Sequence, residues 1–191
     1  MLLSKILPIA ERIRDTLAPY CDQIAIAGSI RRARPECNDI DIVLLPKPGQ
    51  DSAIRARAKS RALSTIINGP HQMIVRLQTG LQLDLYFTHP QMTDLFTTTP
   101  PNWGSVLLCR TGSKEHNIWL AIVSKNLGLH WDPPRGIIPA GGQIVAGATE
   151  EDIYHYLGLS WIPPVRREQG YLCAAEPSSL LHPPLAVPTF P

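Results

Sequence analysis

The chain has 191 residues and a mass of 21.1 kDa, with 44% hydrophobic and 18% charged side chains. This is enough apolar sequence for one domain or two small lobes to bury a core without disulfides or a structural metal, and it excludes a wholly disordered chain. The 18 basic and 16 acidic side chains give a formal charge of +2, which is too balanced to indicate a nucleic-acid-binding protein by itself.

The first predicted elements are a helix and two buried strands. Leucine and isoleucine residues recur at three- and four-residue spacings over 2–17, which predicts an amphipathic helix. Short apolar runs at 23–27 and 40–45 end at turn residues and predict buried strands.

A basic helix and a hairpin follow. The pattern over 51–67 predicts a helix whose outer face carries Arg55, Arg57, Lys59 and Arg61. Alternating segments at 73–78 and 81–88, separated by Thr79-Gly80, predict a β-hairpin.

The second half contains shorter predicted elements. Residues 114–127 show helical spacing with Gly128 as a C-cap, residues 137–145 predict a small hairpin around Gly141-Gly142, and a capped helix is expected over 149–157. Proline pairs divide the chain, so we expect a first lobe at 1–102, a second at 103–168, and a proline-rich tail at 169–191 that is only loosely attached.

Cysteines and hydropathy indicate the compartment. The four cysteines form no C-x-x-C pair, which indicates neither a zinc site nor a disulfide framework. No apolar run approaches the roughly 20 residues of a membrane span, and the N-terminus lacks a signal-peptide pattern. We therefore expect a cytoplasmic monomer with no membrane partner, with a nucleoid-associated or viral-factory location as alternatives.

Three aspartates carry the chemistry that the sequence suggests. Asp39 and Asp41 alternate along a predicted strand and so project from the same face, while Ile40 and Ile42 point to the core. Asp84 lies in a second, mostly apolar strand, where a lone charge is costly unless it is compensated. Carboxylates gathered at one sheet surface repel each other, and divalent cations relieve that repulsion. The pattern predicts a site for two metal ions.

A glycine-serine turn precedes the aspartate strand. Gly28 has no Cβ and allows close approach of a phosphate, and the Ser29 hydroxyl is a potential donor. Arg32 is placed to add charge-assisted contacts. A lone Gly-Ser turn or a lone D-x-D pair is usually structural, but their order together with Asp84 makes coincidence improbable.

These residues resemble the nucleotidyltransferase motif of the polymerase beta superfamily. A second segment, containing Thr111-Gly112-Ser113-Lys114-Glu115-His116-Asn117, resembles the family X DNA polymerases, as do residues 149–154 and 157–164. The similarity spans about residues 1–168. It implies an α/β (α+β) fold, with a mixed β-sheet flanked by helices as the palm (1–102) and a small α+β thumb (103–168).

The resemblance also implies roles for individual residues. Asp39, Asp41 and Asp84 would be catalytic and would hold two Mg²⁺ ions, for which Mn²⁺ is an expected substitute. The β and γ phosphates would be held by Gly28, Ser29 and Arg32 with the backbone near Asn38. The incoming sugar would lie against Thr111, Gly112 and Ser113, and Asn117 would reach the new base pair. Lys114 and the basic helix face are candidate DNA contacts.

The sequence departs from the family at the sugar-binding position. The two residues before Thr111 are usually aromatic and crowd the ribose 2′ position, whereas this chain has Cys109 and Arg110. The choice between dNTP and rNTP is therefore left open, and Arg110 is either a phosphate or template contact or a surface residue. Because the chain begins at the palm helix, we also expect no lyase, helix-hairpin-helix or phosphoesterase domain, and weak, salt-sensitive DNA binding.

The expected function is templated, Mg²⁺-dependent addition of nucleotides to a DNA 3′-hydroxyl, in gapped or primer-template DNA, for short-gap repair. One alternative is a nucleotidyltransferase that works without a template or on another acceptor. The other is an inactive scaffold that binds DNA ends, which the three aspartates disfavour because their repulsion would be a pure cost without metal chemistry.

Overall fold

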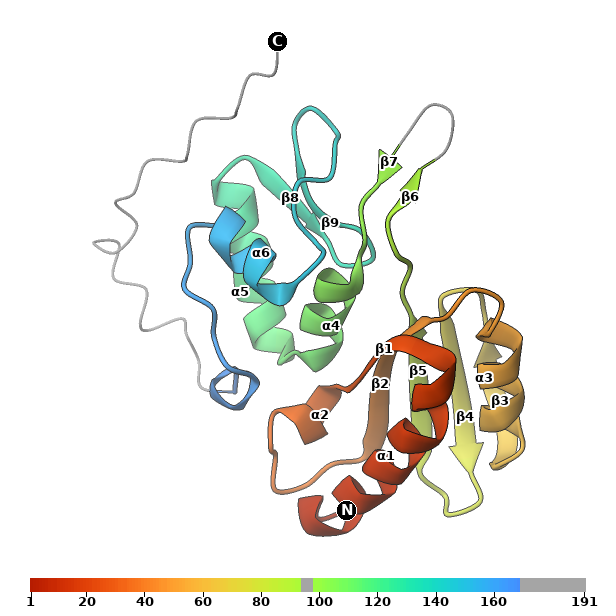
Figure 1. Ribbon diagram of the computed structural model, residues 1–191. Coiled ribbons are helices and arrows are strands. Elements are labelled where there is room, and N and C mark those ends of the chain that lie inside the picture. Colours follow the sequence, from red (N-terminus) through yellow and green to blue (C-terminus); the bar gives the residue numbers. More distant parts are fainter. Residues whose placement is uncertain (94–97, 169–191) are drawn as a thin grey trace.

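The computed structural model describes residues 1–93 and 98–168, which form two lobes (Figure 1). The first lobe is built on a mixed five-stranded sheet of order β1-β2-β5-β4-β3, in which β2 and β5 are parallel and the other neighbours are antiparallel. Its strands are β1 (Cys21–Ile26), β2 (Asp39–Pro46), β3 (Ala62–Asn68), β4 (Gln72–Leu77) and β5 (Gln82–Phe87).

Two helices cover one face of this sheet: α1 (Leu3–Leu17) and α3 (Asp51–Lys59) (Figure 1). Helix α1 buries four apolar residues at helical spacing, Ile6, Ala10, Ile13 and Leu17. They pack with alternate residues of the strands, including Ile40 and Ile42 of β2 and Leu83 and Leu85 of β5. Because strand side chains alternate, Asp39, Asp41 and Asp84 are turned to the opposite face.

The opposite face meets α4 (Trp103–Thr111), which connects the lobes. Val106 and Leu107 of this helix form a buried cluster with Ala27, Val43 and Tyr86 of the first lobe. A short helix, α2 (Gly28–Arg31), follows β1 and also contacts α4. The acidic face of the sheet is therefore also the face that contacts the second lobe.

The second lobe contains α5 (Lys114–Asn126), the hairpin β8 (Leu129–Asp132) and β9 (Gly136–Pro139), and α6 (Glu150–Tyr156). Leu108, Leu120, Ile137 and Ile153 are fully buried in its core. The Ser113 side chain caps α5, and Thr149 and Asp152 form a capping box on α6. Four smaller elements are η1 (Ala18–Tyr20), β6 (Met92–Thr93), β7 (Thr98–Thr99) and η2 (Pro164–Arg166).

The expected fold class is confirmed, with two differences in the elements. The helix predicted over 51–67 ends at Lys59, and its second half is the edge strand β3. Leu63 to Ile67 contains three β-branched residues, which favour a strand, and β4 supplies a pairing partner. The hairpin predicted over 137–145 lies earlier in the chain, where β8 pairs with β9. After β9 the chain turns back, and Ala146 pairs with Ile137 of β9 in an isolated bridge.

Helices α2 and α4 were not predicted. In α2, positive φ at Gly28 is compatible with the expected turn, but the next residues continue as one helical turn. The tail predicted at 169–191 lies outside the described residues. Among the helices that are described, none has the length and apolar character needed to cross a membrane.

Candidate active site

The three aspartates come together on two neighbouring parallel strands. In the register of β2 and β5, Asp41 lies directly opposite Asp84, and Asp39 is two residues before Asp41 on the same face. Asp84 is 6% exposed, and the other two are half-buried. Parallel pairing in register, rather than sequence proximity, is what joins residues 43 positions apart.

Two polar neighbours hold Asp84. Gln82 Nε2 donates to Asp84 Oδ1 at 2.8 Å. The Tyr86 hydroxyl lies 3.2 Å from Asp84 Oδ2 and 3.4 Å from Asp41 Oδ1, so it is shared between the two acids. Gln82, Asp84 and Tyr86 are alternate residues of β5 and thus occupy one face of the strand.

The acids lie in an unfavourable environment for charge. Burial raises the pKa of Asp41 to about 7, and the charges of Asp39 and Asp84 act in the same direction. Burial also raises the pKa of Asp84, while the bonds from Gln82 and Tyr86 oppose the change. A pKa shift of this kind at a surface cleft is typical of functional carboxylates.

The donor set suits a hard divalent cation. It consists of carboxylate oxygens, which Mg²⁺ prefers, on acids that destabilise one another when all are charged. Over residues 1–93 and 98–168, however, no three His, Cys, Asp or Glu side chains are gathered closely enough to form a cation cage as they stand. The residues fit the ion in chemical type, and the three-aspartate metal site stays a prediction.

Gly28 brings the backbone against the acidic pair. A Cβ built on Gly28 would lie 1.9 Å from Asp41 Oδ2, and its φ of +58° is in the region that favours glycine. The next residue, Ser29, has a buried hydroxyl with no hydrogen-bond partner in the described structure. Such an unpaired polar atom beside an open cleft is available to a ligand.

Both lobes contribute to a cleft of about 630 Å³ over the acidic face. This volume is within the range of small-molecule sites. Ten of the residues predicted for the site line the cleft: Gly28, Ser29, Arg32, Asp39, Asp41, Cys109, Arg110, Gly112, Lys114 and Asn117. Asn117 donates from its amide nitrogen to the carbonyl of Cys109 at 2.8 Å, and its buried Oδ1 has no partner in the described structure.

Other predicted residues lie outside the cleft lining. Asp84 is buried and Asn38 is exposed, and neither lines the cleft. Thr111 and Ser113 are buried and bind protein groups: the Thr111 hydroxyl accepts from Arg31 at 2.7 Å, and the Ser113 hydroxyl donates to the carbonyl of Arg167 at 2.7 Å.

Arg32 joins the two lobes at the rim of the cleft. Its guanidinium donates to the carbonyl of Thr111 and to the carboxylate of Glu168. The family resemblance predicts that Arg32 binds phosphate. The structure places it on the cleft wall but already engaged, so a phosphate would have to compete with Glu168 for it.

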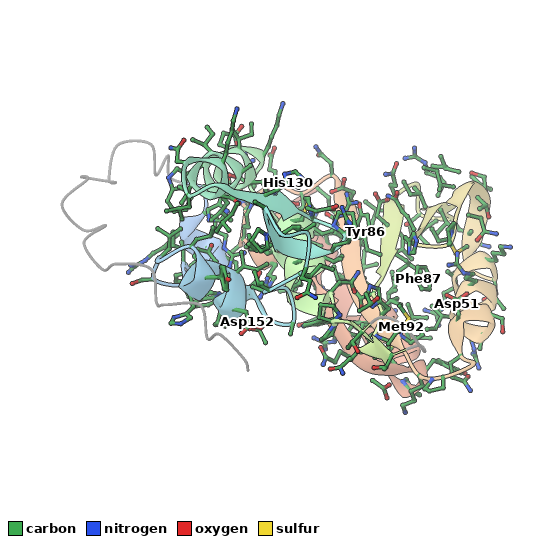
Figure 2. The ribbon with its side chains drawn as sticks, turned by 90° about the horizontal axis from the view of Figure 1, so that it is seen from above. Asp51, Tyr86, Phe87, Met92, His130 and Asp152 are labelled. Atoms are coloured by element: carbon green, nitrogen blue, oxygen red, sulfur yellow. The ribbon has the colours of Figure 1, made fainter. Side chains whose placement is uncertain are left out.

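The basic face of α3 is on the other side of the first lobe. Arg55 pairs with Asp51 at 2.6 Å and lies 4.0 Å from the centre of the Phe87 ring, and Arg57 donates to the Tyr20 hydroxyl. Figure 2 shows Asp51 and Phe87 at this end of the molecule, away from His130 of the second lobe. Lys59 is exposed at the end of α3, whereas Arg61, predicted on the helix face, lies exposed in the turn that follows the helix.

The prediction from the sequence did not include several residues of the site. Tyr86 could have been found, because it is two positions after Asp84 in a strand and so must share its face. Glu150 and Arg167 are buried and paired, but nothing local distinguishes Glu150 from the other acids that begin α6. Ile118, Ala121, Trp131 and Pro133 line the cleft only because α5 and β8 fold over it.

Comparison with known proteins gives matches of three kinds. The family model for the DNA polymerase beta thumb matches residues 106–168. The DNA polymerase/3′-5′ exonuclease PolX of Bacillus subtilis (strain 168) is 28% identical over 166 residues, which are 86% of this chain and 28% of that relative. The chain therefore spans much less than half of the curated relative it matches.

The fold is shared with a solved structure. A ternary P/T complex of Leishmania infantum polymerase beta aligns with a TM-score of 0.69 at 15% identity, covering 87% of this chain and 76% of that one. The thumb match lies in the second lobe and the structural match extends over both. These matches show that the chain is similar to the family X DNA polymerases, in sequence to the polymerase beta thumb and to PolX, and in fold to polymerase beta.

Proposed function

We propose that the chain is a nucleotidyltransferase that adds nucleotides to the 3′-hydroxyl of a template-bound DNA primer, and that it fills short gaps in repair. The observation that supports this most is the shared cleft in which Asp39, Asp41 and Gly28-Ser29 of the first lobe face Gly112 and Asn117 of the second. The structural neighbour, described as a ternary P/T complex, supports DNA as the partner.

The three aspartates would act, through bound metal ions, on the 3′-oxygen of the primer. Asp39, Asp41 and Asp84 would hold two Mg²⁺ ions, or Mn²⁺ in their place. When bound, such ions lower the pKa of an attacking hydroxyl and neutralise charge on a triphosphate and its leaving pyrophosphate. The primer 3′-hydroxyl would give its proton to Asp84, and its oxygen would form a bond to the α-phosphorus. The bond from the α-phosphorus to the oxygen that bridges to the β-phosphorus would break, and pyrophosphate would leave with both electrons of that bond.

The remaining walls would position the nucleotide. Close approach at Gly28 and the unpaired Ser29 hydroxyl suit the phosphate oxygens. The unpaired Oδ1 of Asn117 suits a donor on the base or sugar. Each of these groups leaves a polar atom or a gap that a bound nucleotide would satisfy.

Primer extension tests the proposal. Purified protein receives gapped or open template-primer DNA, Mg²⁺ and each dNTP or rNTP singly, beside Asp84→Asn and the control Asp22→Asn, which removes an exposed acid of β1. We expect template-matched addition that Asp84→Asn reduces at least about 100-fold and Asp22→Asn leaves unchanged.

Each other outcome has a definite meaning. Addition without regard to the template favours a terminal transferase. DNA binding without any extension by the wild-type protein contradicts catalysis and favours the inactive scaffold. Extension that survives Asp84→Asn contradicts the role of the acidic face.

A further inference from the structure

Arg110 lies on the acidic side of the cleft, at the end of α4. It is exposed and lines the cleft with Asp39 and Asp41. Its guanidinium carbon is 4.1 Å from the centre of the Tyr86 ring. The hydroxyl of the same ring bonds to Asp41 and Asp84. Tyr86 therefore touches both acids with its hydroxyl and the arginine with its face.

The charge of Arg110 acts on the acids without a direct ion pair. In the part of the chain that the structure describes, Arg110 has no carboxylate within 4.0 Å. Burial raises the pKa of both Asp41 and Asp84, and the charge of Arg110 opposes that rise in each. No carboxylate of the described residues therefore neutralises the guanidinium, and its charge acts on the side of the cleft that Asp39 and Asp41 line.

This arrangement has opposite effects on two ligands. A free divalent cation is attracted by the acids and repelled by Arg110. A metal–triphosphate complex is an anion overall, and its phosphate oxygens are acceptors that a guanidinium binds well. A positive charge beside the acids therefore disfavours the free cation and favours the complex.

We propose that Arg110, held on the ring of Tyr86, makes the cleft select a metal–nucleoside triphosphate complex over a free divalent cation. The proposal rests on the proposed function, because it assumes that a nucleotide binds in this cleft. It assigns Arg110 a role in specificity that depends on charge.

Two binding measurements test it, neither of which needs catalysis. Binding of MnCl₂ alone is followed by electron paramagnetic resonance, and binding of Mg²⁺–dATP without DNA is followed by calorimetry. For Arg110→Gln we expect Mn²⁺ to bind about three- to tenfold more tightly, and Mg²⁺–dATP to bind about three- to tenfold more weakly, as for a unit charge several ångströms away in a partly exposed site. Arg110→Lys keeps the charge and should stay within about twofold of wild type for Mn²⁺.

Arg12→Gln is the matched control, since it removes the same charge from an exposed position on α1 outside the cleft. Affinities that move in the same direction for both ligands, or equal changes in Arg12→Gln, overturn the proposal. Wild-type protein that binds Mn²⁺ but no Mg²⁺–dATP contradicts the proposed function itself. Wild-type binding of both ligands that Arg110→Gln leaves unchanged contradicts only the role of Arg110.

Discussion

Arg31 donates two hydrogen bonds, of 2.6 and 3.0 Å, to the buried carboxylate of Glu150, which lies 119 positions further along the chain. Arg167 donates two more, of 2.9 and 3.1 Å, to the same carboxylate. Burial acts to raise the pKa of Glu150, but the bonds from Arg167 and Arg31 outweigh it and hold the pKa below its usual value. This three-residue group ties α2 of the first lobe, whose Gly28 and Ser29 line the cleft, to α6 of the second.

We expect Glu150→Gln to lower the free energy of unfolding by about 3 kcal/mol, measured by urea denaturation. Arg167 is 1% exposed, and removing the opposite charge leaves its guanidinium buried without compensation. Glu151→Gln, which changes an exposed acid at the next position of α6, is the matched control and should stay within about 0.5 kcal/mol of wild type.

The same pair of variants tests the link to the cleft. If Glu150 joins the lobes, Glu150→Gln weakens Mg²⁺–dATP binding even at temperatures where the protein is fully folded, and Glu151→Gln does not. Equal stability of the two variants would show that the buried group contributes nothing beyond a surface pair.

The sequence predicted the parts of the fold that depend on local pattern. The helix over 2–17, the strands at 23–27 and 40–45 and the capped helix at 149–157 follow from spacing and capping residues, and the structure has them within a few residues. The helix over 51–67 was wrong beyond Lys59, because pairing of Ala62–Asn68 with β4 outweighs the helical spacing of its apolar residues.

The candidate site also has a part that local sequence pattern predicts and a part that it does not. Same-face placement of Asp39 and Asp41 follows from strand alternation alone. The placement of Asp84 opposite Asp41 requires the parallel register of β2 and β5, and the roles of Glu150 and Arg167 require the docking of the lobes. Contacts between distant segments are fixed by packing, for which a single sequence has no local signal.

A second prediction concerns pH. Burial lowers the pKa of His116 to about 4, and the charge of Arg167 acts in the same direction. Between about pH 6.5 and pH 4 the unfolded chain therefore takes up a proton that the folded protein excludes. The stability that neutral His116 contributes is present above pH 6.5 and is lost as the pH falls toward 4.

Denaturation at pH 7 and pH 5 measures this effect. We expect the wild-type free energy of unfolding to fall by roughly 2 kcal/mol more than that of His116→Gln over this interval. His155→Gln removes an exposed histidine from α6 and should behave as wild type. An equal loss in all three proteins would mean that His116 is not the group responsible.

A third prediction separates the arginines of α3. Arg55 bonds to Asp51, Asn68 and the carbonyl of Pro70, so Arg55→Gln should lower the free energy of unfolding by about 1 to 2 kcal/mol. Lys59, at the end of α3, and Arg61, in the turn that follows, are exposed, so they are the candidates for DNA contacts on this side of the lobe. The double variant Lys59→Gln and Arg61→Gln should leave stability unchanged.

Salt dependence of DNA binding distinguishes the two kinds of residue. If Lys59 and Arg61 each neutralise a DNA phosphate, the double variant reduces the slope of log K against log salt by about 1 per phosphate. The double variant Lys5→Gln and Arg12→Gln, which removes two exposed positive charges from α1, provides the control for net charge. A slope equal to that of wild type would show that the basic face of α3 is only solvated.

A fourth prediction concerns the close approach at Gly28. Gly28 and Gly49 both have positive φ, of +58° and +76°, but an added Cβ at Gly49 meets nothing within 4 Å, whereas at Gly28 it meets Asp41 Oδ2 at 1.9 Å. Both alanine variants incur backbone strain of about 1 kcal/mol. Only Gly28→Ala must also displace the Asp41 carboxylate.

The comparison of the two variants isolates that displacement. A shift of about 1 Å in a catalytic group costs on the order of 100-fold in rate, so Gly28→Ala should reduce primer extension by about that factor while Gly49→Ala retains the wild-type rate. Stability measured in parallel corrects for the shared strain. If Gly28→Ala extends primers as well as Gly49→Ala, the reaction does not require the position that Asp41 takes against the backbone of Gly28. In that case Asp39 and Asp84 would be the carboxylates that the reaction needs.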